Sequence, residues 1–586
     1  MERPRFKQPV YLRHPVYRSR SWLRTSDLSL ILVATAIGAI AGLVTIAIAE
    51  LAHGLQHLFY GVGINRLSAL ASIRHPAKLL FLPLGGAILG GVYWLSRKRP
   101  ALVDVVEANA LHGGRIPKYD TLWVCLQTII SNGFGASVGL EAAYAQAGGG
   151  IASVAGRWLR LRRADMRRLV GAGAGAAIGA AFAAPLTGAF YGFEVVIGAY
   201  TPAAIAPVTA AALAAALVTR ASGETPYLIV ASVPEQITTI DYLLFCGLGV
   251  VCAVAGILMM RAQTLIERWI ARSPLPKHWA PVIGGLLMIP LAWTSPQALS
   301  SGHGALRLEI ALEPAFTFLL FVFALKALAS IVSLSFGFRG GLFFASLFLG
   351  SLLGPVYAQV ANALIGHPVL GNLDAALVGM AAFATTVVGA PMSVSLLVLE
   401  TTHDFAVTGV VIAASLCASA FTRANFGYSF STWRFHMRGS AIRSPRDIGW
   451  IKALTARRLM RRDATLVPES ATIAEFRAKV PLGSTSRVLL AGPEREYCGI
   501  VETARAYDPA LDPEAPVTSI AQLEEDAIPP STDIAQVLDC FEQLGTEDLA
   551  VVDGRGRILG VVTEKYAHRR YIEESEKAQS ALFGES

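Results

Sequence analysis

The most constraining feature of this chain is a series of long apolar stretches, which begins near Leu28 and recurs to about Thr422 with few interrupting charges. A helix that crosses a bilayer needs about 20 apolar residues, so this region is long enough for roughly ten or more spans. Of the 586 residues, 53% are apolar and only 16% are charged, a balance typical of membrane proteins. We therefore expect an all-α polytopic membrane domain.

The composition changes after about Arg434, where charges return and short alternating runs replace the long apolar ones. Such runs indicate a small domain that contains strands. The expected organisation is a basic arm over 1–26, a membrane domain over 27–440, a linker over 441–455, a small α/β domain over 456–575 and a tail over 576–586.

Basic residues cluster beside the apolar stretches. The first 24 residues contain seven Arg and Lys against one acid, Glu2, and further arginines lie between Arg157 and Arg168 and after the last apolar stretch. Cytoplasmic loops of membrane proteins are enriched in such residues. We therefore expect a protein of the bacterial inner (plasma) membrane with both termini in the cytoplasm. The first residues lack the apolar core of a cleavable signal peptide, so none is expected. Topology then explains the net charge of +8, and no nucleic-acid partner is expected.

An internal repeat divides the apolar region. The motif that runs from Gly139 through Glu141 aligns with Gly341 through Phe343 at an offset of 202 (341 minus 139). The Ala-Pro pair at Pro185 aligns with that at Pro391 at an offset of 206 (391 minus 185). Inverted repeats of transporters place the transport site where the halves meet, so we expect two inverted halves over about 27–220 and 237–440.

Several apolar segments are too broken to cross a membrane straight, which predicts re-entrant half-helices. Pro185 and Pro391 each interrupt an apolar run, and glycines precede the helix-like stretches after Gly135 and Gly341. A helix that begins inside the membrane presents N–H groups without partners and about half a positive charge, which binds an anion. Residues 132–150 contain no Lys or Arg, although Arg339 precedes the second helix start.

Glu141 is an acid in a small and apolar stretch at one of these helix starts. A membrane carboxylate is costly unless something compensates it. The helix start compensates it, so the side chain can occupy the place of an anion until a proton removes its charge. This predicts a protonatable gate. The alternative is an acid that complements the helix dipole at a solvent-exposed end.

Two roles are open for each of three further side chains. Glu194 and Glu400 end the apolar runs after the two prolines, and we expect them to cap or pair at the cytoplasmic end of the helices rather than to carry protons. The hydroxyl of Tyr428 could donate to an anion, or its ring could belong to the aromatic belt of the interface.

The motifs resemble those of the CLC family of chloride channels and transporters. Gly139-Leu140-Glu141 is similar to its Gly-Arg-Glu-Gly-Pro motif, and Gly340-Gly341-Leu342-Phe343 to its Gly-Gly-Ile-Phe-Ala-Pro motif. The resemblance covers about 27–440. It implies the CLC fold, a homodimer with one pathway per subunit for chloride or a similar anion such as nitrate, and a gate at Glu141. The anion-binding positions that it implies are Leu140, Leu342, Phe343, Tyr428 and Pro100.

Three departures from the family pattern bear on function. An ungapped count from Glu141 places Pro100 where the family has an anion-binding serine, and members with proline there can prefer nitrate. Val195 occupies the position of an internal proton-transfer glutamate, and its apolar side chain cannot relay a proton, which favours a passive channel. Leu140 and Ala142 replace an arginine and a glycine beside the gate.

The tail has its own repeat, because Val488-Leu489-Leu490 corresponds to Leu549-Ala550-Val551 at an offset of 61 (549 minus 488). Two apolar runs around Asp553-Gly554 predict a hairpin, and Ser531, Thr532 or Asp533 is expected to cap the helix before it. The pattern resembles a tandem CBS pair. The resemblance implies adenine-nucleotide binding as one role and dimer bracing as another, and Tyr566 stands where nucleotide-binding members have an aspartate.

Three classes of function remain open. A passive anion channel is slightly favoured over a proton-coupled anion exchanger, which would need a proton route that avoids Val195. A CBS-regulated cation transporter or membrane enzyme is the third class, and the sequence lacks the acid clusters or partnered nucleophile that it would need. The six cysteines have no metal-ligand spacing. We therefore expect no enzyme activity, no metal and no required cofactor.

Overall fold

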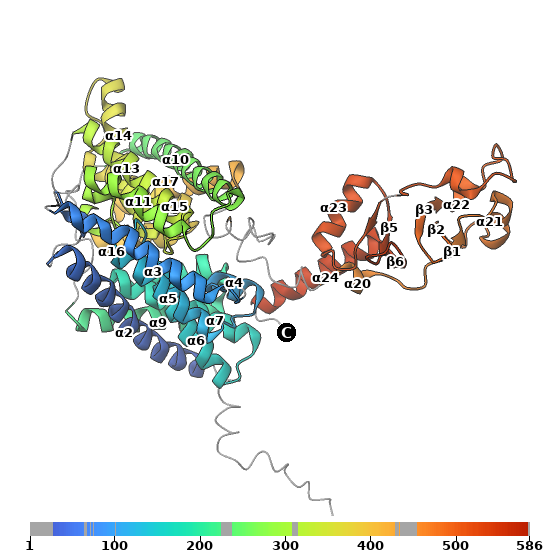
Figure 1. Cartoon of the computed structure of the whole chain (residues 1–586), viewed down its shortest axis with the longest axis horizontal. Helices are drawn as coiled ribbons and strands as arrows, with labels where there is room; N and C mark the ends of the chain where they lie inside the picture. The colour runs from blue at the N-terminus through green and yellow to red at the C-terminus, as the bar shows by residue number, and fades with distance from the viewer. Residues whose placement is uncertain are drawn as a thin grey trace, which may run out of the picture. The chain divides into compact units, whose positions relative to one another are not determined.

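A computed structural model describes residues 27–63, 67–70, 72–73, 75–99, 101–223, 237–306, 315–427, 433, 454–524 and 526–583. The basic arm, Pro100 and Tyr428 lie outside these residues. The chain divides into two compact units, Met1–Asp447 and Ile448–Ser586. In Figure 1 the first unit consists of helices and the labelled strands all lie in the second.

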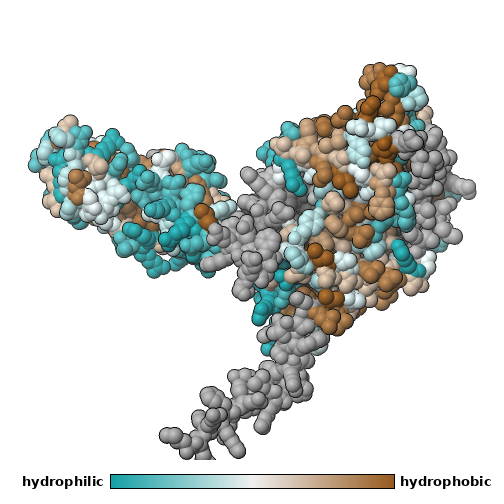
Figure 2. All heavy atoms as spheres, turned by 180° about the vertical axis from the view of Figure 1, so that it is seen from behind, coloured by the Kyte–Doolittle hydropathy of each residue, from teal (hydrophilic) through white to brown (hydrophobic). Residues whose placement is uncertain are grey.

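Seven helical stretches of the first unit are long and apolar enough to cross a membrane, judged over the described ranges. Figure 2 shows brown, apolar side chains over much of this unit and mainly hydrophilic side chains over the other. Exposed Leu, Ile and Trp side chains on these helices suit contact with lipid tails. The stretches are α2 (Asp27–Tyr60), α3 (Phe81–Ser96, preceded by η3, Pro76–Leu80), α9 (Pro202–Ala221), α10 (Thr239–Arg272), α13 (Phe316–Ser335), α14 (Phe343–Ile365) and α17 (Phe405–Asn425).

The other helices of this unit are shorter or poorer in large apolar residues, which is why the seven spans are fewer than the ten or more expected. Many of them lie inside the unit, where Gly148 on α6 and Gly173 on α7 bring the two backbones into contact. These helices are α4 (Val105–Leu111), α5 (Lys118–Gly133), α6 (Glu141–Trp158), α7 (Arg163–Phe182), α8 (Pro185–Tyr191) continued by η4 (Gly192–Ile197), α11 (Ala280–Thr294), α15 (Asn372–Val388) and α16 (Pro391–Thr402).

The two prolines begin helices. Pro185 is the first residue of α8 and Pro391 the first of α16, positions where the missing proline N–H costs no hydrogen bond. The preceding helices α7 and α15 each end at a residue in the left-handed region, Ala183 (φ 52°) and Gly389 (φ 83°). The chain therefore turns sharply between a longer and a shorter helix in each half.

The internal repeat appears as two loops with matching geometry. Gly135 and Gly337 are repeat partners with φ values of 93° and 95°. The Oγ of Ser131 accepts the N–H of Arg339 at 2.9 Å, and the Oγ of its partner Ser333 accepts the N–H of Ser137 at 3.0 Å. Each half thus holds the loop of the other through an equivalent serine. These loops lead directly into α6 and α14.

The tail unit contains two three-stranded sheets that obey the 61-residue repeat. In each sheet the first pair of strands is parallel and the second is antiparallel, in the orders β1-β2-β3 and β4-β5-β6. The elements are α20 (Ala456–Leu459), β1 (Leu466–Pro468), α21 (Ile473–Lys479), β2 (Arg487–Ala491), β3 (Tyr497–Glu502), α22 (Thr503–Ala506), β4 (Ala527–Ile528), α23 (Ile534–Leu544), β5 (Asp548–Val552), β6 (Ile558–Thr563) and α24 (Glu564–Phe583).

Side chains of both sheets meet in one apolar cluster that includes Leu489 and Ala550. Of the three cap residues considered from the sequence, Asp533 is the N-cap of α23, where its carboxylate accepts the N–H of Gln536 at 3.1 Å. The repeated strands, helix and turn therefore form two modules with a shared core.

Candidate anion site

The starts of α6 and α14 meet through a two-residue bridge. Gly139 and Gly341 are repeat partners, and their backbones exchange two hydrogen bonds, with N–H to O distances of 2.9 Å and 3.0 Å. The following residues, Leu140 and Leu342, are the N-caps of the two helices. Neither cap has a side-chain acceptor for the first N–H groups of its helix. Two helix N-termini from different halves therefore open into one region, as expected from the sequence.

The carboxylate of Glu141 occupies this region. Its Oε1 accepts the backbone N–H of Phe344, in the first turn of α14, at 3.0 Å. The residue is only 4% exposed. Its Oε2 is also buried and accepts no hydrogen bond from any residue that the structure describes. Glu141 therefore lies buried inside the unit, so the alternative of a dipole-complementing acid at a solvent-exposed helix end is wrong.

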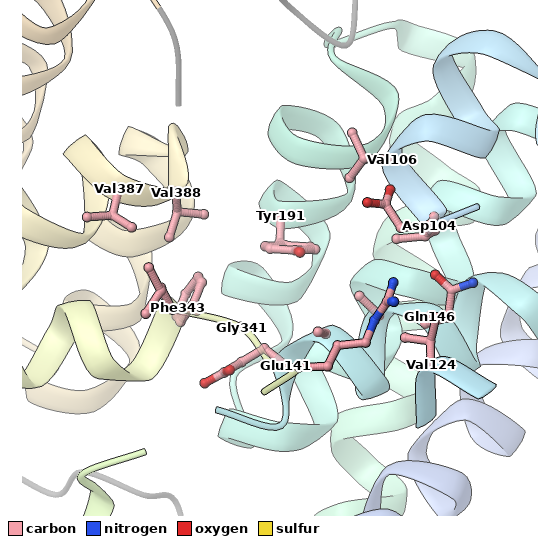
Figure 3. A pocket seen from close by; sticks show the side chains of 16 residues that line it. Asp104, Val106, Val124, Glu141, Gln146, Tyr191, Gly341, Phe343, Val387 and Val388 are labelled. Carbon is pink, nitrogen blue, oxygen red and sulfur yellow. The ribbon is translucent and has the colours of Figure 1, made fainter. Parts of the chain in front are cut away.

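A cavity of about 120 Å³ adjoins this carboxylate, and we call it the anion cavity. Figure 3 shows Glu141, Tyr191 and Phe343 around it, with Asp104 on a further helix start. Phe343 and Tyr191 pack edge to face, with 6.1 Å between ring centroids. The remaining lining residues are Val105, Val106, Val124, Ala142, Ala145, Gln146, Arg339, Gly340, Gly341, Leu342, Val387 and Val388.

A family model described as "Voltage gated chloride channel" matches residues 85–423, which is more than half of the chain. The chain belongs to this family. A second family model, for a CBS domain, matches residues 512–571. Anion transport across a membrane is thus the general function of this CLC chain, and its family consists of channels and transporters rather than enzymes.

A curated relative and two solved structures agree with this membership. A protein from Ralstonia nicotianae named "Putative chloride channel protein ClcB-like" is 28% identical over 386 residues, which are 64% of this chain and 89% of the relative. The structure of a slow cyanobacterial Cl⁻/H⁺ antiporter matches with a TM-score of 0.62 at 21% identity, covering 70% of this chain and 97% of that one. A eukaryotic CLC transporter matches with a TM-score of 0.58 at 18% identity, covering 94% and 98%.

The expected site residues of this CLC chain fall into three groups. Glu141, Leu342 and Phe343 line the anion cavity, and Leu140 caps α6 beside it. Val195 is buried in η4 at 5% exposure, among apolar neighbours and outside the cavity lining. Pro100 and Tyr428 lie beyond the described residues. The third helix start at the cavity belongs to α4, and its N-cap is Asp104, whose carboxylate accepts the N–H of Glu107 at 2.9 Å.

Glu194 and Glu400 each cap a helix of the other half. Glu400 accepts the N–H groups of Leu186 and Thr187 in the first turn of α8, at 2.8 Å and 2.9 Å. Glu194 accepts those of Met392 and Ser393 in the first turn of α16, at 3.0 Å and 2.9 Å. Each carboxylate also accepts a side-chain hydroxyl, from Thr187 or Ser393. This reciprocal capping occupies both oxygens of both acids.

Three residues at or behind the site were not identified from the sequence. Tyr191 supplies a ring and a hydroxyl to the anion cavity, and Asp104 caps α4 at its edge. Lys326 on α13 is fully buried, and its Nζ donates to the carbonyl oxygens of Ser300 and Ala298 at 2.6 Å and 3.4 Å. The lysine interacts electrostatically with Glu141. A single Lys in an apolar run was the available signal, because buried membrane cations mark functional regions.

The described residues contain no group of three or more His, Cys, Asp or Glu side chains that could hold a metal ion. In the tail, Arg487 on β2 and Asp548 on β5 form an ion pair at 3.9 Å between the two CBS-like modules, and both are largely buried. Tyr566 lies on α24, directly after β6. The Arg487–Asp548 ion pair therefore joins the two modules of the tail.

Proposed function

We propose that this protein moves chloride or a similar monovalent anion such as nitrate, and that protonation of Glu141 opens its pathway. The observation that carries the proposal is the hydrogen bond from the Phe344 N–H to Glu141 Oε1, at a point where two helix starts converge. The carboxylate thus takes the place that an anion would occupy.

The proposed gating step is a competition between two negative charges. An ionised Glu141 is stabilised by the Phe344 N–H in the first turn of α14 and by Lys326. A proton removes that charge, so the side chain loses its advantage over an anion, which can then reach Phe343, Phe344 and the anion cavity. Low dielectric strengthens each of these interactions relative to water.

Passive conduction is slightly favoured over proton-coupled exchange. Val195 is buried and apolar, so it cannot pass a proton between Glu141 and the far side of the membrane. The relative from Ralstonia is named a chloride channel and one similar structure is an antiporter, so exchange along another proton route is the second candidate.

Flux measurements on purified protein in liposomes test both proposals. We expect chloride and nitrate efflux that rises as the pH falls, and E141Q should abolish that pH dependence because an amide stays neutral. Unchanged pH dependence in E141Q would remove the gating role. Uphill proton movement driven by an anion gradient would replace the channel by an exchanger.

The proposed assembly is a homodimer in a bacterial inner membrane, with one pathway per subunit and both termini in the cytoplasm. The CBS pair braces that dimer or binds an adenine nucleotide. Titration of the full protein with ATP tests the second role, since bound nucleotide would raise its melting temperature.

A further inference from the structure

A second cavity lies on another side of Glu141. Its volume is about 50 Å³, and we call it the histidine cavity because His53 and His303 line it. Glu141 is the single described residue that lines both this cavity and the anion cavity. A space of this size holds a few water molecules or a carboxylate group. The remaining lining residues are Thr45, Ile46, Ala49, Glu50, Tyr144, Ala180, Ala181, Phe182, Ala183 and Thr219.

His303 is tied directly to the element that holds the gate. Its ring stacks on the ring of Phe344, with 3.4 Å between centroids and 28° between planes. The backbone N–H of the same Phe344 donates to Glu141 Oε1. The Nδ1 of His303 contacts the Oγ of Ser301, and the neighbouring Ser300 carbonyl accepts Lys326. The Phe344 ring and the Ser301 hydroxyl therefore fix the position of the imidazole.

Only one of the two oxygens of the Glu141 carboxylate has a hydrogen-bond donor among the described residues. Oε1 has its N–H donor, whereas the buried Oε2 accepts no hydrogen bond from a described residue. A buried carboxylate oxygen without a donor costs free energy. The histidine cavity offers two imidazoles, which become donors and cations when protonated.

We propose that the histidine cavity receives the Glu141 carboxylate when the gate leaves the anion site, and that protonated His303 is the positioning residue that holds it there. This inference rests on the proposed gating role of Glu141. It adds a second way for acid to open the pathway, in which the gate leaves as a carboxylate and pairs with an imidazolium.

Other charged groups face the same cavity and determine whether it attracts or repels an incoming Glu141 carboxylate. On α2, Glu50 precedes His53 by three residues, and its negative charge opposes an incoming carboxylate. On α9, the guanidinium of Arg220 donates to the Ala183 carbonyl at the cavity wall at 3.4 Å. α6 contributes the phenol of Tyr144, and α7 contributes apolar residues. Because the negative charge of Glu50 offsets the positive charge of protonated His53, we assign the larger part of the stabilisation of the displaced Glu141 carboxylate to His303.

The test is the pH profile of chloride efflux from liposomes that contain the full-length protein. We expect H303Q to move the midpoint of acid activation by about one pH unit toward acid, because loss of one interacting charge shifts a titration by about that much. H53Q should cause a smaller shift in the same direction. H367Q is the matched control, since His367 is an exposed histidine that lines neither cavity, and its profile should equal that of the wild type.

A double-mutant cycle separates this inference from the gating proposal. In the E141Q background there is no carboxylate to receive, so E141Q/H303Q should conduct like E141Q. A wild-type profile for H303Q, with pH dependence still abolished by E141Q, would overturn the inference and leave the gate in place. Loss of flux in both H303Q and E141Q/H303Q would also overturn it, because the defect would not act through Glu141.

Discussion

Gly139 lies directly against Glu141: a Cβ at this position would be only 2.6 Å from Cδ of Glu141. Side-chain carbons do not approach that closely, so only glycine leaves room for the carboxylate where it accepts the Phe344 N–H. Gly341 is similar, since its Cβ would be 2.7 Å from Oε2 of Glu141. Repeat symmetry thus places a glycine on both sides of one acid.

G139A should expel the carboxylate from the anion site. We expect chloride efflux at neutral pH to rise toward that of E141Q and its pH dependence to shrink, because the added methyl group takes the space of the gate. Liposome flux at pH 5 and pH 7.5 measures this. G91A is the control, since a Cβ at Gly91 would meet no atom within 4 Å; a G139A protein with the wild-type profile would contradict the geometry.

E194A and E400A should each destabilise the helical unit by about 1 to 2 kcal/mol, as expected for loss of a helix cap. Each change leaves the first-turn N–H groups of α16 or α8 without their carboxylate. The melting temperature of the purified protein in detergent should fall for both variants, and less for E194Q and E400Q, which keep one acceptor oxygen. The control E267A, at an exposed residue of α10, should leave the melting temperature unchanged. Equal melting temperatures in all variants would show that the caps are dispensable.

In the E141Q background, where no carboxylate competes for the site, K326M should weaken anion binding several-fold. The positive potential that Lys326 exerts on the Glu141 carboxylate acts equally on a chloride ion that replaces it, and methionine keeps the length of the side chain without the charge. Chloride titration of the detergent-solubilised protein by calorimetry measures the change. K277M, in a loop on the surface, controls for net charge, and equal affinities would mean that Lys326 has only a structural role.

The tail should lose stability as the pH rises, because burial raises the pKa of the Asp548 carboxyl above its ordinary value even though Arg487 lowers it. The folded tail therefore keeps a proton that the unfolded chain has lost, and its stability falls as the pH rises through the folded-state pKa, by at most about 1.4 kcal/mol per unit.

D548N should flatten this dependence, and R487M should steepen it because the carboxylate then loses the cation of its ion pair. Hydrogen exchange of β2 and β5 in the full protein, from pH 4 to pH 8, measures the effect. D539N alters an exposed acid of α23 and should retain the wild-type slope. An unchanged slope in D548N would assign the pH dependence to another group.

The sequence alone determined which segments are apolar, where the halves repeat and which acid interrupts a helix start. These properties are local. The membrane unit is identified by the length of its apolar stretches, by its prolines and glycines, and by the matched offset of Gly139 and Gly341. The 61-residue offset identifies the paired modules of the tail. Glu141 could be chosen because a carboxylate in such a stretch requires compensation.

Only the tertiary structure decided which groups compensate it. The Phe344 N–H and Lys326 act on Glu141, and Tyr191 and His303 line the cavities beside it. These groups belong to helices and loops that lie up to about two hundred residues away, and no local pattern specifies such contacts. The same holds for Glu194 and Glu400, whose partners belong to the opposite half. Hydrogen bonds and charges act over a few ångströms in space, so their partners are fixed by how the two halves pack against each other.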